Sequence, residues 1–236
     1  VAATPTQPPQ QTQQNPAQAQ AAAPVAPALN FADWRAGFRA KALQAGIQPQ
    51  VFDQAFAGVT PDLSVVKADG AQPEFTRPVW EYLDGAISPL RVRKGQALLA
   101  EHAATLDAIE QRYGVDRETL VAIWGMESSF GQFMGEQSVI RSLATLAYEG
   151  RRHEFFKREL INALKIIQQG HIPASLMEGS WAGAMGQCQF MPSSFLKFAA
   201  DGNGDGKRDI WNSLPDVFAS AANYLAMNGW KGDESW

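Results

Sequence analysis

The sequence LVAIWGMESSFG, residues 120–131, combines an amphipathic helix with a charged residue in an unexpected place. Leu120, Trp124 and Glu127 follow one another at spacings of four and three, which puts Glu127 on the apolar face of the predicted helix. Burying an unpaired carboxylate is costly, so such a group is usually neutralised or paired. Glu127 is therefore either a general acid with a raised pKa or a structural carboxylate that is paired with an arginine or reaches water.

Composition limits the classes of protein to consider. The chain has 236 residues, a net charge of −4 and a single cysteine. The acidic balance argues against nucleic acid as a partner. The lone Cys188 excludes an intrachain disulfide and is interpreted as a small buried side chain. No apolar run approaches the length of a membrane span.

Residues 1–29 are rich in Pro, Gln and Ala and contain no charged residue. Such a segment buries too little apolar surface to offset its ordering entropy, so we expect a disordered tether. An uncharged leader without an initial methionine fits an exported protein, and it equally fits a chain cut from a longer one.

The remainder of the chain shows helical periodicity and almost no strand signal. We expect helices near residues 31–46, 51–56, 89–113, 116–128, 139–150 and 155–170, with an extended connection at 58–79. Trp80 and Tyr82 fit the edge of a cleft or an aromatic core. The fold class is mainly α, a packed helical assembly with ligand-binding loops between helices.

The run GSWAGAMGQCQFMPSS, residues 179–194, interrupts the helical pattern. Glycine-rich backbone can approach a ligand closely, and the interleaved aromatic and methionine side chains are costly to leave in water. The segment is predicted to line a cleft, with a long surface loop as the alternative.

The run DGNGDGKRDIWN, residues 201–212, resembles an EF-hand calcium loop. Oxygen-bearing side chains stand at loop positions 1, 3, 5 and 9, glycine stands at position 6, and position 7 offers its carbonyl. Asn212 replaces the bidentate glutamate of position 12, which should weaken affinity. The spacing predicts a structural calcium site, with a plain Gly/Asp turn as the alternative. The predicted ligands are Asp201, Asn203, Asp205, Lys207 through its carbonyl, and Asp209.

Together with WGMESSFG (124–131), ATLAYEGRRHEFF (144–156) and AANYLAMNGW (221–230), these two runs make residues 30–236 resemble the family B lytic murein transglycosylases. The resemblance implies a lysozyme-like catalytic core with an additional helical lobe. It also implies non-hydrolytic cleavage of the β-1,4 bond between N-acetylmuramic acid and N-acetylglucosamine in peptidoglycan. Family members usually continue beyond the NGW motif, so we expect either that the sequence ending at Trp236 is truncated or that part of the cleft wall is absent.

By motif position, the resemblance assigns Glu127 as the single acid and base, and it implies structural Ca²⁺ in the EF-hand-like loop. The arginine pair suits carboxylates of the glycan strand because guanidinium forks bind them in two-point fashion. The implied substrate-binding residues are Ser180, Gln189, Phe190, Arg151, Arg152, Tyr224 and Tyr82.

Two alternatives to the lyase stay open. A lysozyme-like hydrolase would need a second carboxylate, such as Glu136 or Glu149, across the cleft. A calcium-stabilised peptidoglycan-binding module would need no turnover. The expected partner in every case is the peptidoglycan glycan strand. We expect the protein to be a monomer without a transmembrane segment. We expect it to be located in the periplasm or cell envelope.

Overall fold

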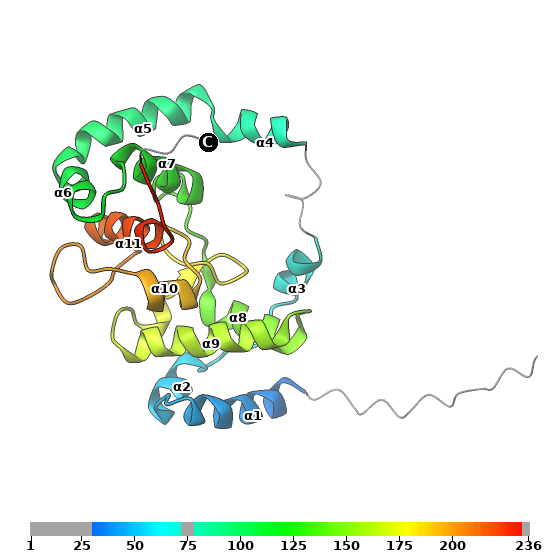
Figure 1. Cartoon of the computed structure of the whole chain (residues 1–236). Coiled ribbons are helices and arrows are strands. Elements are labelled where there is room, and N and C mark those ends of the chain that lie inside the picture. The colour runs from blue at the N-terminus through cyan, green and yellow to red at the C-terminus, as the bar shows by residue number, and fades with distance from the viewer. Residues whose placement is uncertain (1–29, 72–77, 233–236) are drawn as a thin grey trace, which may run out of the picture.

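The computed structural model describes residues 30–71 and 78–232; the predicted tether at 1–29 and Trp236 lie outside them. Within these ranges the chain is helical, and the tiers of helices can be followed in Figure 1. The elements in chain order are α1 (Phe31–Gln44), α2 (Pro49–Ala55), α3 (Leu63–Gly70), α4 (Val79–Ala86), α5 (Pro89–Glu101), α6 (Ala103–Tyr113), α7 (Arg117–Ser128), β1 (Gln137–Ser138), α8 (Val139–Glu149), α9 (His153–Gln168), the 3₁₀ turn η2 (Ala174–Leu176), β2 (Glu178–Gly179), α10 (Pro192–Phe198) and α11 (Leu214–Met227).

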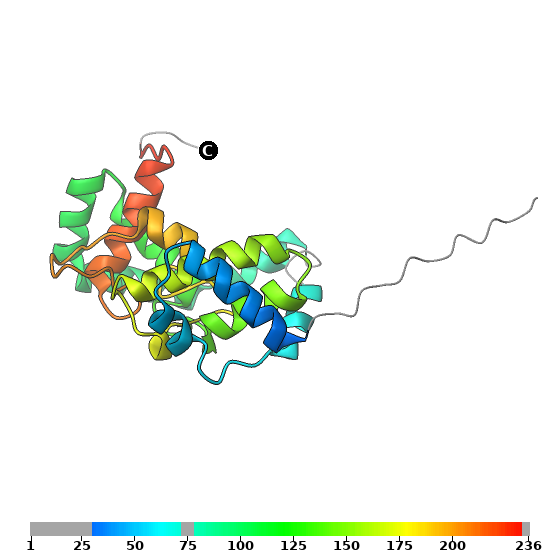
Figure 2. The same ribbon diagram turned by 90° about the horizontal axis from the view of Figure 1, so that it is seen from below.

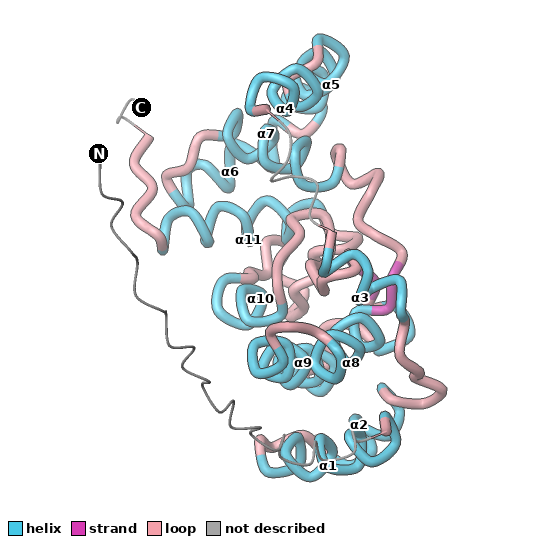
Figure 3. The backbone as a smooth tube through the Cα atoms, turned by 90° about the vertical axis from the view of Figure 1, so that its right-hand side faces the viewer, coloured by secondary structure: helices cyan, strands magenta, loops and turns pink. Residues whose placement is uncertain are grey.

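The buried apolar side chains form two clusters. The first cluster joins α1, α2, α3, α8, α9 and α10 with the glycine-rich loop, and the second joins α6, α7 and α11. Figure 1 and Figure 3 show the same order of tiers, with α1 and α2 at one end, α8 and α9 next, α10 and α11 in the middle, and α5 at the far end. Figure 2 shows α1 lying across α9.

The only sheet in the described ranges is the antiparallel pair β1 and β2, with Gln137 opposite Gly179 and Ser138 opposite Glu178. This short pair ties the segment after α7 to the start of the glycine-rich loop. The prediction of a mainly helical chain with almost no strand is confirmed.

Two expectations about helices were wrong. The connection at 58–79 contains α3, which starts after Asp62, whose Oδ1 accepts from the Ser64 backbone N–H at 2.9 Å. The helix expected at 89–113 is broken at His102, where φ is −104° and ψ is 18°. Both halves keep their apolar periodicity because both pack toward the second cluster, so the sequence pattern hides the bend.

Candidate active site

The helix that carries Glu127 ends in an unusual turn. Ser129, Phe130 and Gly131 are consecutive residues with positive φ, at 51°, 61° and 77°. Left-handed backbone is unfavourable for residues other than glycine and persists only where its surroundings impose it. The Trp124 carbonyl accepts from the Phe130 N–H at 3.1 Å, and the Ser128 Oγ accepts from the Gly131 N–H at 3.0 Å. The end of α7 is therefore fixed by local hydrogen bonds directly after Glu127.

Glu127 faces a cavity of about 290 Å³ between the two clusters. The cavity is lined by Ile123 and Glu127 of α7, Cys188, Gln189, Phe190 and Met191 of the glycine-rich loop, Ser194 of α10, and Ala221, Tyr224 and Leu225 of α11. Glu127 is exposed as a residue, yet burial of its carboxyl group raises its pKa. Among the described residues, no hydrogen-bond donor or cation pairs with this carboxyl group. This environment favours the protonated form that a general acid requires.

The glycine-rich loop supplies one wall of this cavity. Met185 and Phe190 exchange backbone hydrogen bonds, from Met185 N to Phe190 O at 2.8 Å and from Phe190 N to Met185 O at 3.0 Å. Between them Gln189 adopts a positive φ of 50°, and its Nε2 donates to the Met134 and Gly186 carbonyls at 3.0 and 2.8 Å. The loop is folded and largely buried, which agrees with a cleft lining and not with a surface loop.

Cys188 lies in the same wall, but its thiol is a poor nucleophile. Burial, with a smaller contribution from the nearby Glu127 carboxylate, raises the pKa of its thiol to about 12. A thiol with so high a pKa carries almost no thiolate near neutral pH, and thiolate is the nucleophilic form. Cys188 is thus a small buried side chain, as predicted, and Glu127 is the only titratable residue of the lining suited to acid–base chemistry.

Helix α11 adds an aromatic side chain to the lining of the cavity. Tyr224 of α11 packs edge-on against Phe198 at 4.8 Å between ring centroids and at a tilt against Phe190 at 5.6 Å. Tyr224 is 39% exposed, so part of its side chain stays accessible from solvent. Flat apolar faces of this kind suit the apolar faces of sugar rings. The structure therefore brings Gln189, Phe190 and Tyr224 together with Glu127.

Ser180 and Tyr82 do not line this cavity. The Ser180 Oγ accepts from the Ala182 and Ala184 N–H groups at 3.3 and 3.0 Å, which closes a turn of the glycine-rich loop. Tyr82 lies on α4, where it is 54% exposed, and the neighbouring Trp80 is 69% exposed. Their exposure rules out the aromatic-core interpretation of this segment.

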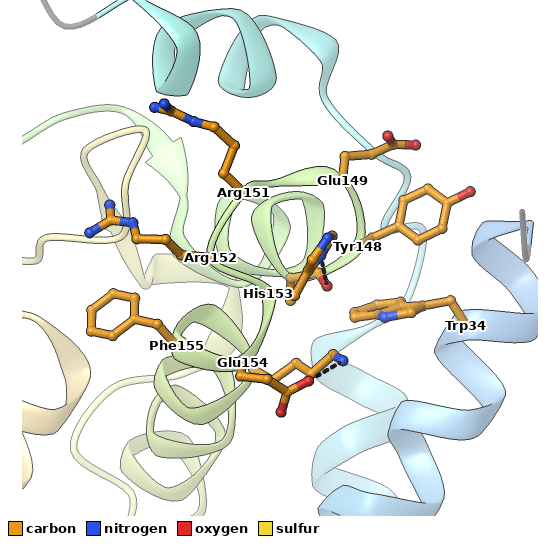
Figure 4. A pocket seen from close by; sticks show the side chains of 10 residues that line it. Trp34, Tyr148, Glu149, Arg151, Arg152, His153, Glu154 and Phe155 are labelled. Atoms are coloured by element: carbon orange, nitrogen blue, oxygen red, sulfur yellow. Dashed lines mark hydrogen bonds and ion pairs between the residues drawn. The ribbon is translucent and has the colours of Figure 1, made fainter. Parts of the chain in front are cut away.

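Arg151 and Arg152 line a second pocket, of about 620 Å³, at the corner between α8 and α9. Figure 4 shows both guanidinium groups extending to one side of this corner, while Trp34 and Tyr148 lie on the other. Arg151 contacts the buried Asp69, with Nε 3.4 Å from its Oδ2. The Arg152 guanidinium lies over the Phe155 and Phe156 rings, at 5.3 and 5.2 Å from their centroids. The arginine pair and the Glu127 cavity are thus separate features of this structure, and Glu149 lines the arginine pocket instead of facing Glu127.

The EF-hand-like run forms a tight loop between α10 and α11. Asp201 Oδ1 accepts from the Gly204 N–H at 2.6 Å and its Oδ2 from the Gly206 N–H at 2.8 Å. These backbone hydrogen bonds, led by that of Gly206, lower the pKa of Asp201. The loop is therefore built around a carboxylate that stays ionised.

One acidic residue that contacts this loop, Asp216 of α11, was not found by the sequence analysis. Oxygens of Asp201, Asp205 and Asp216 lie within 4.8 Å of one another, and the Asp216 side chain is fully buried. Asp216 Oδ1 accepts from Gly202 N–H at 2.8 Å and its Oδ2 from Asp209 N–H at 2.7 Å. Asp209, predicted from position 9, is not in this carboxylate cluster; it caps the turn that leads to Trp211 and Asn212. Three carboxylates converging on one point match the hard oxygen donors that Ca²⁺ prefers.

A helical, lysozyme-like domain with one unpaired acid in a cleft is the class that this fold and site define. Residues 30–236 match the family described as Transglycosylase SLT domain, and the chain belongs to this family. It is 38% identical over 150 residues to membrane-bound lytic murein transglycosylase B of Escherichia coli (strain K12). This alignment covers 63% of the chain and 41% of that protein.

Solved structures of lytic transglycosylases also resemble this chain in fold. SltB3 of Pseudomonas aeruginosa, crystallised in complex with NAG-NAM-pentapeptide, superposes with a TM-score of 0.85 at 60% identity, over 87% of this chain and 55% of that one. Escherichia coli lytic transglycosylase Slt35, in complex with calcium, superposes with a TM-score of 0.76 at 31% identity, over 85% of this chain and 64% of that one. The resemblance to lytic murein transglycosylases and their lysozyme-like fold is confirmed. The chain spans less than two thirds of the length of each of these relatives.

Proposed function

We propose that this chain is a peptidoglycan lytic transglycosylase that cleaves the β-1,4 bond between N-acetylmuramic acid and N-acetylglucosamine without consuming water. The observation that carries the proposal is Glu127, which is unpaired, has a raised pKa and is the only acidic residue lining its cavity among the described residues. The complex of the related SltB3 with NAG-NAM-pentapeptide supports this substrate class.

One carboxyl group is sufficient for this reaction. Protonated Glu127 donates its proton to the glycosidic oxygen, and the bond to the muramoyl anomeric carbon breaks. The resulting carboxylate then takes the proton of the muramoyl C6 hydroxyl, whose oxygen bonds to the anomeric carbon and closes a 1,6-anhydro ring. The 2-acetamido group stabilises the positive charge between these steps, as in other substrate-assisted glycosidases. Glu127 ends the cycle protonated, so protons and atoms balance.

A hydrolase would instead need a second carboxyl group about 5–9.5 Å from the first. Glu136 is exposed and absent from the cavity lining, and Glu149 belongs to the arginine pocket. These positions favour the lyase over the hydrolase.

The test is digestion of purified sacculi followed by mass spectrometry of the soluble products. Wild-type protein should release 1,6-anhydromuropeptides, and Glu127→Gln should release none while keeping its helical circular dichroism. Glu110→Gln is the matched control because it neutralises a glutamate of α6 that lines neither the Glu127 cavity nor the arginine pocket, and it should stay active. Reducing muramoyl ends would instead identify a hydrolase, and binding to sacculi without product a binding module.

We assign the sugar rings nearest the scissile bond to Gln189, Phe190 and Tyr224, which share the cavity with Glu127. The proposed contacts for the rest of the strand are the predicted residues that do not line the cavity, namely Ser180, Tyr82, Arg151 and Arg152. The arginine pocket would take the lactyl or peptide carboxylates. The corresponding alanine variants should raise KM for long glycan strands more than for short muropeptides.

We infer that the EF-hand-like run at residues 201–212, called the acidic loop below, binds structural Ca²⁺ together with α11. The ligands are Asp201, Asp205 and Asp216, and Asn203 and the Lys207 carbonyl complete the oxygen set. The calcium complex of Slt35 supports this inference. When bound, the ion would neutralise converging carboxylates and cross-link the loop to α11; it takes no part in bond cleavage. Isothermal titration with calcium chloride tests the site.

We propose that the protein acts as a monomer in the cell envelope, where peptidoglycan lies. No helix within residues 30–71 and 78–232 is long and apolar enough to cross a bilayer. Light scattering after gel filtration and fractionation of cells test these two points.

A further inference from the structure

The Gln187 side chain connects two parts of the molecule that the proposed function treats separately. Gln187 is 8% exposed in the glycine-rich loop. Its Oε1 accepts from the Trp124 indole N–H of α7 at 2.7 Å, and its Nε2 donates to the Trp211 carbonyl at 2.8 Å. Its backbone N–H donates to the Ile210 carbonyl at 2.8 Å. One buried amide thus bridges the helix of Glu127 and the end of the acidic loop.

On the Trp211 side, the bridge continues to the carboxylate cluster. The Trp211 N–H donates to Asp209 Oδ1 at 3.0 Å, and the Asp209 N–H donates to Asp216 Oδ2 at 2.7 Å. Trp211 is 5% exposed, and its indole N–H donates to the Glu178 carbonyl at 3.0 Å. A change in the position of Asp216 can therefore reach Gln187 through three hydrogen bonds, by way of Asp209 and the buried Trp211.

On the Trp124 side, the bridge meets the left-handed turn after Glu127. The Trp124 carbonyl accepts from the Phe130 N–H in that turn. A Cβ atom added at Gly131 would lie 2.4 Å from Gln187 Oε1, so the amide rests directly against the turn. Left-handed backbone persists only where its surroundings impose it, and the buried Gln187 amide is one of the groups that contact this turn.

We propose that Gln187 is a positioning residue for Glu127 and that it transmits the state of the acidic loop to the catalytic helix. The proposal rests on the lyase assignment and adds a route by which cation binding alters the acid without entering its cavity. Gln187 itself is absent from the lining of the Glu127 cavity. Its effect should therefore appear in kcat, since it orients the acid, and leave KM nearly unchanged.

The first experiment compares variants of the full chain on defined muropeptides. Gln187→Met keeps the length of the side chain and removes both amide hydrogen bonds, and we expect kcat to fall by about 10- to 100-fold with KM within about threefold. Trp124→Phe removes only the bond to α7, and the double variant should lose little more activity than Gln187→Met alone because both changes break one connection.

The matched control is Thr145→Val, which removes a buried hydroxyl that bonds to Asp62 and Arg141 in the first cluster. This variant should lower the melting temperature and leave kcat unchanged. A Gln187→Met protein with the kcat of Thr145→Val would overturn the positioning role.

The second experiment does not depend on activity. The chain has seven tryptophans, and the indole ¹⁵N–H resonance of Trp124 can be assigned by its loss in Trp124→Phe. Titration with calcium chloride should shift this resonance over the concentration range that raises the melting temperature. In Gln187→Met the melting temperature should still rise while the Trp124 resonance stays in place.

The connection between the acidic loop and α7 would be refuted if calcium raised the melting temperature without shifting the Trp124 resonance. It would also be refuted if calcium left the melting temperature unchanged. An inactive wild-type protein with a calcium-responsive Trp124 would refute the lyase assignment and leave the connection standing. The two failures are therefore distinguishable.

Discussion

Replacing Asp216 by Asn tests the acidic loop most directly because the substitution keeps the shape of the side chain and removes its charge. Asp216 is fully buried, and its two oxygens accept from Gly202 N–H and Asp209 N–H. Asn offers one oxygen, so one of these N–H groups then faces an NH₂ group. Leaving a buried donor unsatisfied costs about 1–3 kcal/mol.

This loss of unfolding free energy can be expressed as a fall in melting temperature. For a chain of this size, 1 kcal/mol shifts the melting temperature by about 2–4 °C, so Asp216→Asn should melt about 2–12 °C below wild type in chelator. Calcium at 100 times its dissociation constant should add about 2.7 kcal/mol of stability to wild type, or about 5–11 °C. Asp216→Asn should lose most of this second gain because one of the three converging carboxylates is gone.

The assay is thermal unfolding followed by circular dichroism, with chelator or calcium chloride. Asp209→Asn is the control, since its amide oxygen can still accept from Trp211 and Asn212 and since Asp209 lies outside the carboxylate cluster. The EF-hand spacing predicts that Asp209→Asn weakens the calcium response, whereas the structure predicts that it does not. A full calcium response in Asp216→Asn would refute the ligand assignment, and an unchanged melting temperature in chelator would refute the argument from burial.

Three further predictions concern other parts of the site. Because the folded state raises the pKa of Glu127, wild type loses stability as pH rises from the ordinary pKa of 4.5 through the raised pKa. Glu127→Gln should therefore melt above wild type at neutral pH but not below pH 4.5; an equal difference at both would contradict this. Cys188 should react with a thiol reagent at neutral pH only after unfolding, because burial raises its pKa to about 12; rapid labelling of folded protein would disprove it. Gly135→Ala should lower the melting temperature by several degrees, because its Cβ would lie 2.1 Å from the Gly179 carbonyl oxygen. Gly58→Ala, at positive φ without a close neighbour, should cost less, as unfolding curves will show.

Local signals were sufficient to predict most helices but not the bends between them. The apolar spacing predicted a helix near residues 31–46, and α1 forms there with Asn30 as its N-cap and with Phe38 and Ala42 buried. The break at His102 leaves no local signal because its cause is tertiary: the imidazole ring lies 5.9 Å from the Trp124 ring and 6.3 Å from the Phe218 ring. Such contacts between distant segments override helical propensity.

The site was also predictable in part, since the acid and two wall residues were found and one carboxylate of the acidic cluster was not. The periodicity that put Glu127 on the apolar face located the acid, and the wall residues Gln189 and Phe190 lie in the glycine-rich run that interrupts the helices. Asp216 was missed because it stands 15 residues after Asp201, outside a 12-residue loop, and only the orientation of α11 brings it back to the cluster. No spacing rule contains that orientation.

The absence of a partner for Glu127 is a requirement of its chemistry and has a cost to the fold. A nearby arginine would stabilise the carboxylate and lower its pKa, which would leave too little of the acid form near neutral pH. Arg151 contacts Asp69 and Arg91 donates to the Ala86 carbonyl at 2.9 Å, and no arginine or lysine is among the residues that line the Glu127 cavity. The chain therefore keeps a destabilising group at the boundary of its two clusters, where partial burial can raise the pKa of Glu127 and the cavity still admits a sugar ring. The other interpretation of Glu127, a buried ion pair, would have kept its carboxyl group ionised. The protonated form that the reaction needs would then be lost.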